Sequence, residues 1–202
     1  MSELIKNKAI RGVAWSAVEK FARQGLMALF TILIARQLSP SDYGLVAMLT
    51  ILLAIAQIFV DSGFVEALIQ KQDRTEIDFS TTFWFNIGVA LVIYSILFIS
   101  APLVASFYKE PLLKELLIWL SLLFVINSVQ QAKLNIAMNF RRQAWISVIA
   151  ISASGGVGLW MAYHSFGVWT LVWQQLLQNF LNVVLLWISA EWKPTLIFSK
   201  DS

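Results

Sequence analysis

The sequence predicts an all-α, polytopic membrane protein whose helices form one bundle. Hydrophobic residues make up 58% of the 202 residues and charged residues only 13%, whereas an ordinary soluble domain carries about 25% charged residues. The mean hydropathy is +0.71. The charges gather in short clusters between long apolar runs, a pattern typical of membrane-spanning helices separated by loops.

Six apolar runs are long enough to cross the ~30 Å hydrocarbon core of a bilayer, which takes about 20 helical residues. They cover residues 12–37, 43–69, 80–107, 112–137, 144–164 and 168–187. The breaks between them are short and carry turn-forming or charged residues, at 39–42, 71–74, 109–111, 141–142 and 164–167. Short loops join antiparallel neighbours, so residues 1–202 are expected to form a single six-transmembrane-helix lobe.

The distribution of lysine and arginine predicts the orientation of this lobe, because cytoplasmic loops carry an excess of both residues. If the loops alternate between the two sides, ten of the 15 basic residues fall on one side and three on the other. The ten are Lys6, Lys8, Arg11, Lys71, Arg74, Lys133, Arg141, Arg142, Lys193 and Lys200. Both termini belong to that side, so we expect both in the cytoplasm, with the chain multi-pass in a bacterial inner membrane.

The composition also argues against several classes of site. The chain has no cysteine and one histidine, His164, which excludes disulfides and thiolate zinc sites and disfavours a histidine-rich metal centre or a catalytic triad. No carboxylate pair or nucleophile with a base stands out, and no basic patch with interleaved aromatic residues suits nucleic acid. We therefore expect no enzymatic activity, no cofactor or metal, and no nucleic-acid partner.

The first apolar run carries charges that cost about 2.5 to 3.5 kcal/mol each inside a membrane. They lie on one polar helical stripe, opposite an apolar face that includes Phe21 and Ala28. The stripe comprises Ser16, Lys20, Arg23, Gln24, Met27 and Thr31. Intramembrane charges usually face a pathway or a substrate, which predicts a wet cavity along this stripe.

Charge pairing offers an alternative explanation. Glu19 precedes Arg23 by four residues, an order that favours an ion pair on a helix. Asp61, in the second run, has a similar predicted depth and could pair with Lys20 or Arg23. The charges would then be structural, or the first segment would begin as an interfacial amphipathic helix and enter the membrane only after Arg23.

The sixth run carries a group of amides whose spacings of three, four and seven place most of them on one helical face. They are Gln174, Gln175, Gln178, Asn179 and Asn182. Amide donors and acceptors near the rings of Trp169 and Trp173 suit sugar hydroxyls and pyranose faces. Alternatively, these amides hold membrane helices together through hydrogen bonds.

The fifth run contains two pairs of small residues four positions apart, Ser152/Gly156 and Ser154/Gly158. Small residues at this spacing let helix backbones approach closely. The sequence therefore predicts close helix packing here. A glycine-rich phosphate cradle is disfavoured, because it would need a strand before the helix.

Several stretches resemble a known family. They read WSAVEKFARQG, ILIARQLSPSDYGLVAM, IFVDSGFVEALIQ, DFSTTFWFN and LNIAMNFRRQAW. The chain resembles, over essentially its whole length, the polysaccharide transporters of the multidrug/oligosaccharidyl-lipid/polysaccharide exporter superfamily, the Wzx-like flippases and exporters of O-antigen and capsular polysaccharide. The most specific parts are residues 36–44, RQLSPSDYG, and residues 61–64, DSGF.

The resemblance implies an architecture and a cargo. Family members have two six-helix lobes facing a central cavity, so this chain is expected to be the N-terminal lobe, completed by a C-terminal lobe or a second chain. The cargo is a polyprenyl-pyrophosphate-linked oligosaccharide, exported across the inner membrane for lipopolysaccharide O-antigen, capsule or exopolysaccharide biosynthesis. On this sequence, the resemblance makes Lys20, Arg23 and Arg36 candidate ligands of the pyrophosphate, and Asp61 and Glu19 candidates for ion coupling or charge pairing.

Three other functions stay open at the level of sequence. The chain could be a membrane-embedded enzyme of glycan assembly, although its short loops argue against a large periplasmic domain. It could be another exporter of the same superfamily, or an inactive fragment. Besides lipid-linked oligosaccharide and membrane lipids, the expected partners are the second lobe and the glycan polymerase or ligase machinery.

Overall fold

The computed structural model describes residues 20–60, 76–134 and 140–189, which form helices joined by short turns. These residues contain six helices and no strand. The helices are residues 20–35, α2 (Pro40–Val60), α4 (Glu76–Tyr108), α5 (Leu112–Leu134), α6 (Phe140–Tyr163) and α7 (Trp169–Ser189). The predicted all-α class is therefore confirmed.

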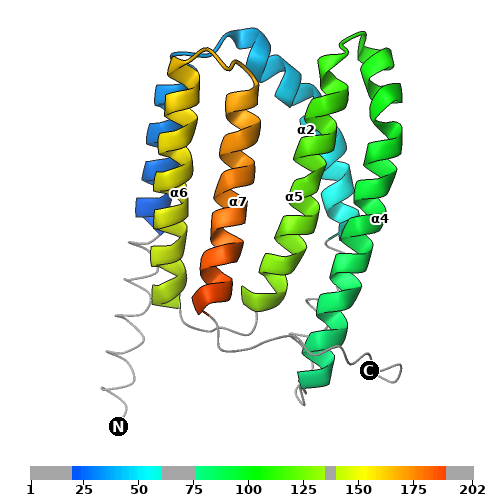
Figure 1. The fold of residues 1–202 in the computed structure, drawn as a ribbon, viewed down its shortest axis with the longest axis vertical. Coiled ribbons are helices and arrows are strands. Elements are labelled where there is room, and N and C mark those ends of the chain that lie inside the picture. The colour runs from blue at the N-terminus through cyan, green and yellow to red at the C-terminus, as the bar shows by residue number, and fades with distance from the viewer. Residues whose placement is uncertain (1–19, 61–75, 135–139, 190–202) are drawn as a thin grey trace.

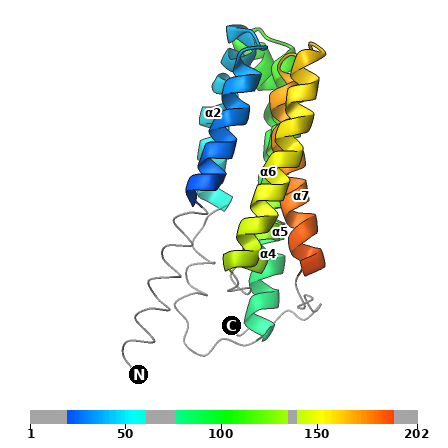
Figure 2. The same ribbon diagram turned by 90° about the vertical axis from the view of Figure 1, so that its left-hand side faces the viewer.

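The helices form two layers (Figures 1 and 2). One layer is a row in which α4 packs on α5, α5 on α7 and α7 on α6. The helix at residues 20–35 and α2 form the second layer, on one face of this row, where α2 contacts α4 and α5. One face of α7 is turned toward the second layer. This face lies between the helix at 20–35 and α2.

Four of the described helices are long and apolar enough to cross a bilayer. The spans are Pro40–Val60, Trp84–Tyr108, Trp145–Tyr163 and Trp169–Ile188. The other two predicted runs, 12–37 and 112–137, extend into residues outside the described ranges. Helix α4 begins at Glu76, four residues before the predicted start at residue 80. Helical hydrogen bonding needs no hydrocarbon around it, so the polar turn before the apolar run continues the helix.

One buried apolar cluster joins the row to α2. Alanines Ala90, Ala101 and Ala105 form the buried side of α4, and leucines such as Leu113 and Leu117 form that of α5. Helix α2 contributes Leu49, Ala56 and Val60, and α7 contributes Val172 and Leu176. The outer face of α4 instead exposes large side chains, including Ile99 at 72% and Leu103 at 69%. In a membrane protein, such a face suits contact with lipid tails.

The start of α2 is fixed by a reciprocal cap. Ser39 precedes Pro40, and its hydroxyl donates to Asp42 Oδ2 at 2.6 Å while the Ser39 N–H donates to the same oxygen at 3.0 Å. The Asp42 N–H in turn lies 3.3 Å from Ser39 Oγ. This is a capping box with proline at the first helical position, where a missing N–H costs nothing. It gives a physical reason for the serine, proline and aspartate of the RQLSPSDYG stretch.

We expect Ser39→Ala to lower the free energy of unfolding by about 1 kcal/mol, the usual cost of losing an N-cap. Thermal unfolding of the protein in detergent micelles measures this loss. Ser41→Ala is the matched control, because among the described residues the Ser41 hydroxyl contacts the hydroxyl of Ser39 alone, at 2.7 Å. Equal losses in the two variants would contradict a specific capping role for Ser39.

Glycines on α6 let the helix at residues 20–35 approach closely. A Cβ on Gly155 would overlap the ring of Phe30, and a Cβ on Gly158 would lie 3.2 Å from side-chain atoms of Ile34 and Gln174. Phe30 lies against Gly155 and Ile34 against Gly158. Because both residue numbers increase in the same direction, the two helices run parallel. Small residues at a helix interface permit this approach.

Only one of the two predicted small-residue pairs takes part in this packing. Ser154 and Gly158 are both buried. Ser152 and Gly156 are exposed, and a Cβ on Gly156 would meet nothing within 4 Å among the described residues. The prediction of close packing thus holds for Ser154/Gly158 and not, in the described part of the chain, for Ser152/Gly156. The two pairs lie on nearly opposite faces of α6, and among the described helices only one of these faces meets a neighbour.

Candidate functional site

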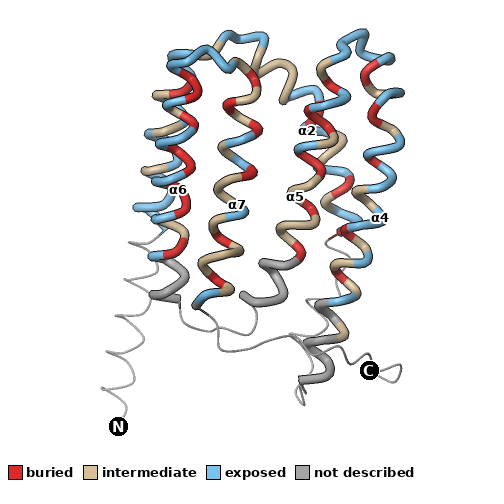
Figure 3. The backbone as a smooth tube through the Cα atoms, viewed as in Figure 1, coloured by how far each residue is buried: buried red, intermediate tan, exposed pale blue. Residues whose placement is uncertain are grey.

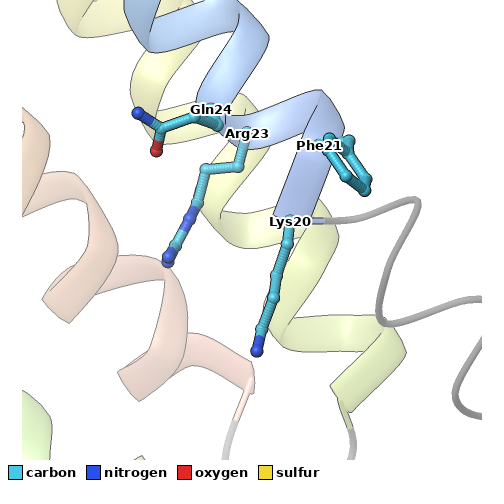
Figure 4. A pocket seen from close by; sticks show the side chains of 4 residues that line it. All are labelled: Lys20, Phe21, Arg23 and Gln24. Carbon is cyan, nitrogen blue, oxygen red and sulfur yellow. The ribbon is translucent and has the colours of Figure 1, made fainter.

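A cationic pocket lies at the start of the helix at residues 20–35. Lys20, Phe21, Arg23 and Gln24 line this open pocket, which has a volume of about 410 Å³. All four side chains are exposed. Figure 4 shows Lys20 and Arg23 extending in the same direction, with Phe21 pointing away from them. The sequence placed Phe21 on the opposite, apolar face, so its place at the edge of the pocket was not foreseen.

Helical spacing places the two cations on the inward side of their helix. Arg23 is separated from Phe30 by seven residues and from Ile34 by eleven, so all three lie on one row of the helix surface. Phe30 and Ile34 are the residues that lie against α6. Arg23 continues this row toward the other end of the helix, and Lys20 lies one turn further on. The row therefore packs against α6 at one end and carries charge at the other.

Neither cation has an ion-pair or hydrogen-bond partner among the residues that the structure describes. The predicted partners Glu19 and Asp61 lie outside those residues. Three carboxylates have described side chains, those of Asp42, Glu110 and Glu115, and all three lie at the opposite end of the bundle, where α2 and α5 begin. Among the side chains that the structure describes, the pocket thus presents two positive charges without a compensating carboxylate, an arrangement that attracts anions.

Arg36 lies apart from this pocket. It follows the last residue of the helix at 20–35, and 13 residues separate it from Arg23, about 20 Å at 1.5 Å per residue. Its side chain is exposed, and its N–H donates to Ile32 O at 3.3 Å. A cation at this position interacts favourably with the carboxyl end of the helix. The structure therefore brings Lys20 and Arg23 together and places Arg36 elsewhere.

The five predicted amides of α7 occupy different environments. Gln174 packs near Gly158, and Asn182 is buried, at 7% exposed. Gln175 is exposed, while Gln178 and Asn179 are half-buried. The Asn179 side-chain Nδ2 donates to Gln175 O at 2.8 Å, which uses one of its donors within the helix. The amides are thus not equivalent as candidate ligands, although one helix carries them all.

The described residues contain no group of three or more His, Cys, Asp or Glu side chains suited to a metal ion. His164 directly follows α6; its Nδ1 is 2.8 Å from Trp160 O, and its ring centroid lies 4.4 Å from that of Trp160, with the ring planes tilted by 34°. This local contact accounts for the single histidine.

Comparison with known proteins places this geometry in a family. Residues 33–202 match the family described as polysaccharide biosynthesis protein. The chain belongs to that family. The match confirms the resemblance to polysaccharide transporters noted in the sequence. No solved structure matches the chain.

Three relatives of this polysaccharide biosynthesis protein carry informative names. The chain is 28% identical to the succinoglycan biosynthesis transport protein ExoT of Rhizobium meliloti (strain 1021), over 98% of its own length and 41% of the relative. It is 26% identical to the teichuronic acid biosynthesis protein TuaB of Bacillus subtilis (strain 168), over 96% of its own length and 41% of the relative. It is also 27% identical to the lipopolysaccharide biosynthesis protein WzxC of Escherichia coli (strain K12), over 60% of its own length and 25% of the relative.

The chain spans about two fifths of the length of ExoT and TuaB. Lys20 and Arg23 precede the residues matched to the family, but the alignment with ExoT covers 98% of the chain and so includes them. Together with the four membrane-length helices, the comparisons identify a membrane protein of the polysaccharide biosynthesis family.

Proposed function

We propose that the protein translocates polyprenyl-pyrophosphate-linked oligosaccharide across the bacterial inner membrane, for O-antigen, capsule or exopolysaccharide synthesis. The observation that carries this proposal is the pair Lys20 and Arg23, exposed on the inward row of the helix at residues 20–35, with no carboxylate beside them among the described side chains. A pyrophosphate is the anion that such a pair suits, because the guanidinium fork of arginine binds phosphate oxygens in a bidentate manner.

The family supports a glycan as the rest of the cargo. ExoT is named as a transport protein, and WzxC and TuaB are named for the biosynthesis of lipopolysaccharide and teichuronic acid. These names favour export over glycan-assembly chemistry, so we propose a transporter and not an enzyme. The remaining part of the translocation pathway would come from a second lobe or a second chain, working beside the glycan polymerase or ligase.

The basic residues of the sequence support an orientation for this transporter. If the side with ten lysines and arginines faces the cytoplasm, the start of the helix at 20–35 lies toward that side, and so does the pocket. A lipid-linked glycan completed in the cytoplasm would then meet Lys20 and Arg23 as it enters.

Deletion of the gene tests this function. We expect polyprenyl-linked oligosaccharide to accumulate on the cytoplasmic face of the inner membrane, out of reach of a sugar-binding probe that is confined to the periplasm. The measurement compares probe binding to intact spheroplasts with binding after the membrane is opened. Completed units that accumulate on the periplasmic face, unpolymerised or untransferred, would contradict translocation and favour a glycan-assembly enzyme.

A further inference from the structure

Helix α7 has an inward amide face, formed by Gln175, Gln178, Asn179 and Asn182. On one side of this face, Gln174 lies near Gly158, whose other near neighbour is Ile34. On the other side, Val172 and Leu176 belong to the buried cluster shared with α2. At 100° per residue, the four amides occupy the arc between these two sides. The inward amide face is therefore turned toward the second layer, which the helix at 20–35 and α2 form; Figures 1 and 2 show the positions of these helices.

The opposite face of α7 is apolar and exposed. Phe180 is 54% exposed, and Trp173, 41% exposed, packs its ring on that of Trp119 at 5.2 Å. This face suits lipid. The side chain of Gln175 is exposed, and among the described residues neither it nor Gln178 makes a side-chain hydrogen bond. An unpaired amide is costly in hydrocarbon, so the inward amide face requires water or a polar ligand.

The inward amide face reaches the level of the cationic pocket along the bundle axis. Helix α7 runs antiparallel to the helix at 20–35, and Gln174 and Ile34 lie at the same level because both contact Gly158. At 1.5 Å per residue, Arg23 lies about 16 Å from that level and Asn182 about 12 Å from it, in the same direction. Asn182 is therefore within about 5 Å of the level of Arg23, and Gln175 lies about 10 Å further along the axis than Asn182. A ligand held at the pocket could extend along the amides.

We infer that the inward amide face binds the sugar part of the cargo and determines which glycans are accepted, an inference that rests on the proposed function. Each amide offers both a donor and an acceptor, the complement of a sugar hydroxyl. A site built to hydrogen-bond a hydroxyl rejects analogues that lack it, because its polar groups are then left unpaired. The pocket binds the pyrophosphate, which all cargoes share, and the amides bind the sugars, which differ between cargoes.

Binding of two lipids tests this inference. The protein expressed from its complete gene is reconstituted in nanodiscs and titrated with undecaprenyl pyrophosphate and with the lipid-linked oligosaccharide extracted from the source organism. We expect the wild type to bind the sugar-bearing lipid more tightly. Replacing both Gln175 and Gln178 by leucine should weaken binding of that lipid about tenfold, equal to about 1.4 kcal/mol, and leave undecaprenyl pyrophosphate binding unchanged.

Gln174→Leu is the matched control, because the stem of Gln174 packs near Gly158 outside the inward amide face. It should retain the preference for the sugar-bearing lipid. Equal weakening of both lipids in the double variant would show a structural role for the amides and overturn the inference. A wild type that binds the two lipids equally would overturn it as well, while leaving pyrophosphate recognition intact. Failure to bind either lipid would instead contradict the proposed function, and this inference with it.

Discussion

Arg23→Ala is expected to lower glycan export about tenfold or more while leaving the abundance of the protein in the membrane nearly unchanged. Arg23 is exposed in the cationic pocket and has no partner among the described residues, so its removal breaks no described contact. A hydrogen bond to a charged group contributes about 1.5 to 3 kcal/mol, and each 1.4 kcal/mol corresponds to a tenfold change in binding. Surface glycan per cell, divided by the amount of protein, measures the effect.

Two further variants give this result its meaning. Arg23→Lys keeps the charge but loses the planar fork, so it should fall between the wild type and Arg23→Ala. Arg36→Ala removes a cation about 20 Å along the helix axis from the pocket and should leave export close to normal. If Arg23→Ala reduces protein abundance as much as export, the charge is structural, as in the alternative of an ion pair with Glu19 or Asp61.

Gly155→Val should destabilise the protein by about 1 to 3 kcal/mol, the range for overpacking a filled interface. A Cβ at this position overlaps the ring of Phe30. Phe30 and Gly155 belong to different helices, so the helix at 20–35 must shift away from α6 to make room. Unfolding in mixed detergent micelles with increasing denaturing detergent measures the loss in the free energy of unfolding.

Gly156→Ala is the control for this effect. Gly156 is exposed and has open space around it among the described residues, so the added methyl group should be neutral or stabilising, by up to about 1 kcal/mol from helix propensity. Combining Gly155→Val with Phe30→Leu should recover part of the stability, because the smaller side chain can yield. No recovery in the double variant would contradict the contact between Phe30 and Gly155 as the cause.

The sequence could predict the elements of the fold because they depend on local quantities. Run length and hydropathy decide which segments cross a membrane, and turn chemistry decides where helices begin, as Ser39, Pro40 and Asp42 do for α2. The early start of α4 at Glu76 was missed for the same reason, since hydropathy marks the span and not the helix. The RQLSPSDYG stretch that carries the family resemblance contains the Ser39–Asp42 capping box, which starts α2.

By itself, the sequence determined that the protein is an all-α membrane protein that resembles polysaccharide transporters, and that Lys20 and Arg23 share one face of a helix. Only the tertiary structure decided which neighbour each face meets. It showed that Ser154/Gly158 and not Ser152/Gly156 packs within the described chain, that Arg36 lies apart from the pocket, and that Gln174 packs near α6 while Gln175 stays exposed. Helical periodicity fixes the angle between two side chains on one helix, but the position of the next helix depends on contacts between residues far apart in sequence.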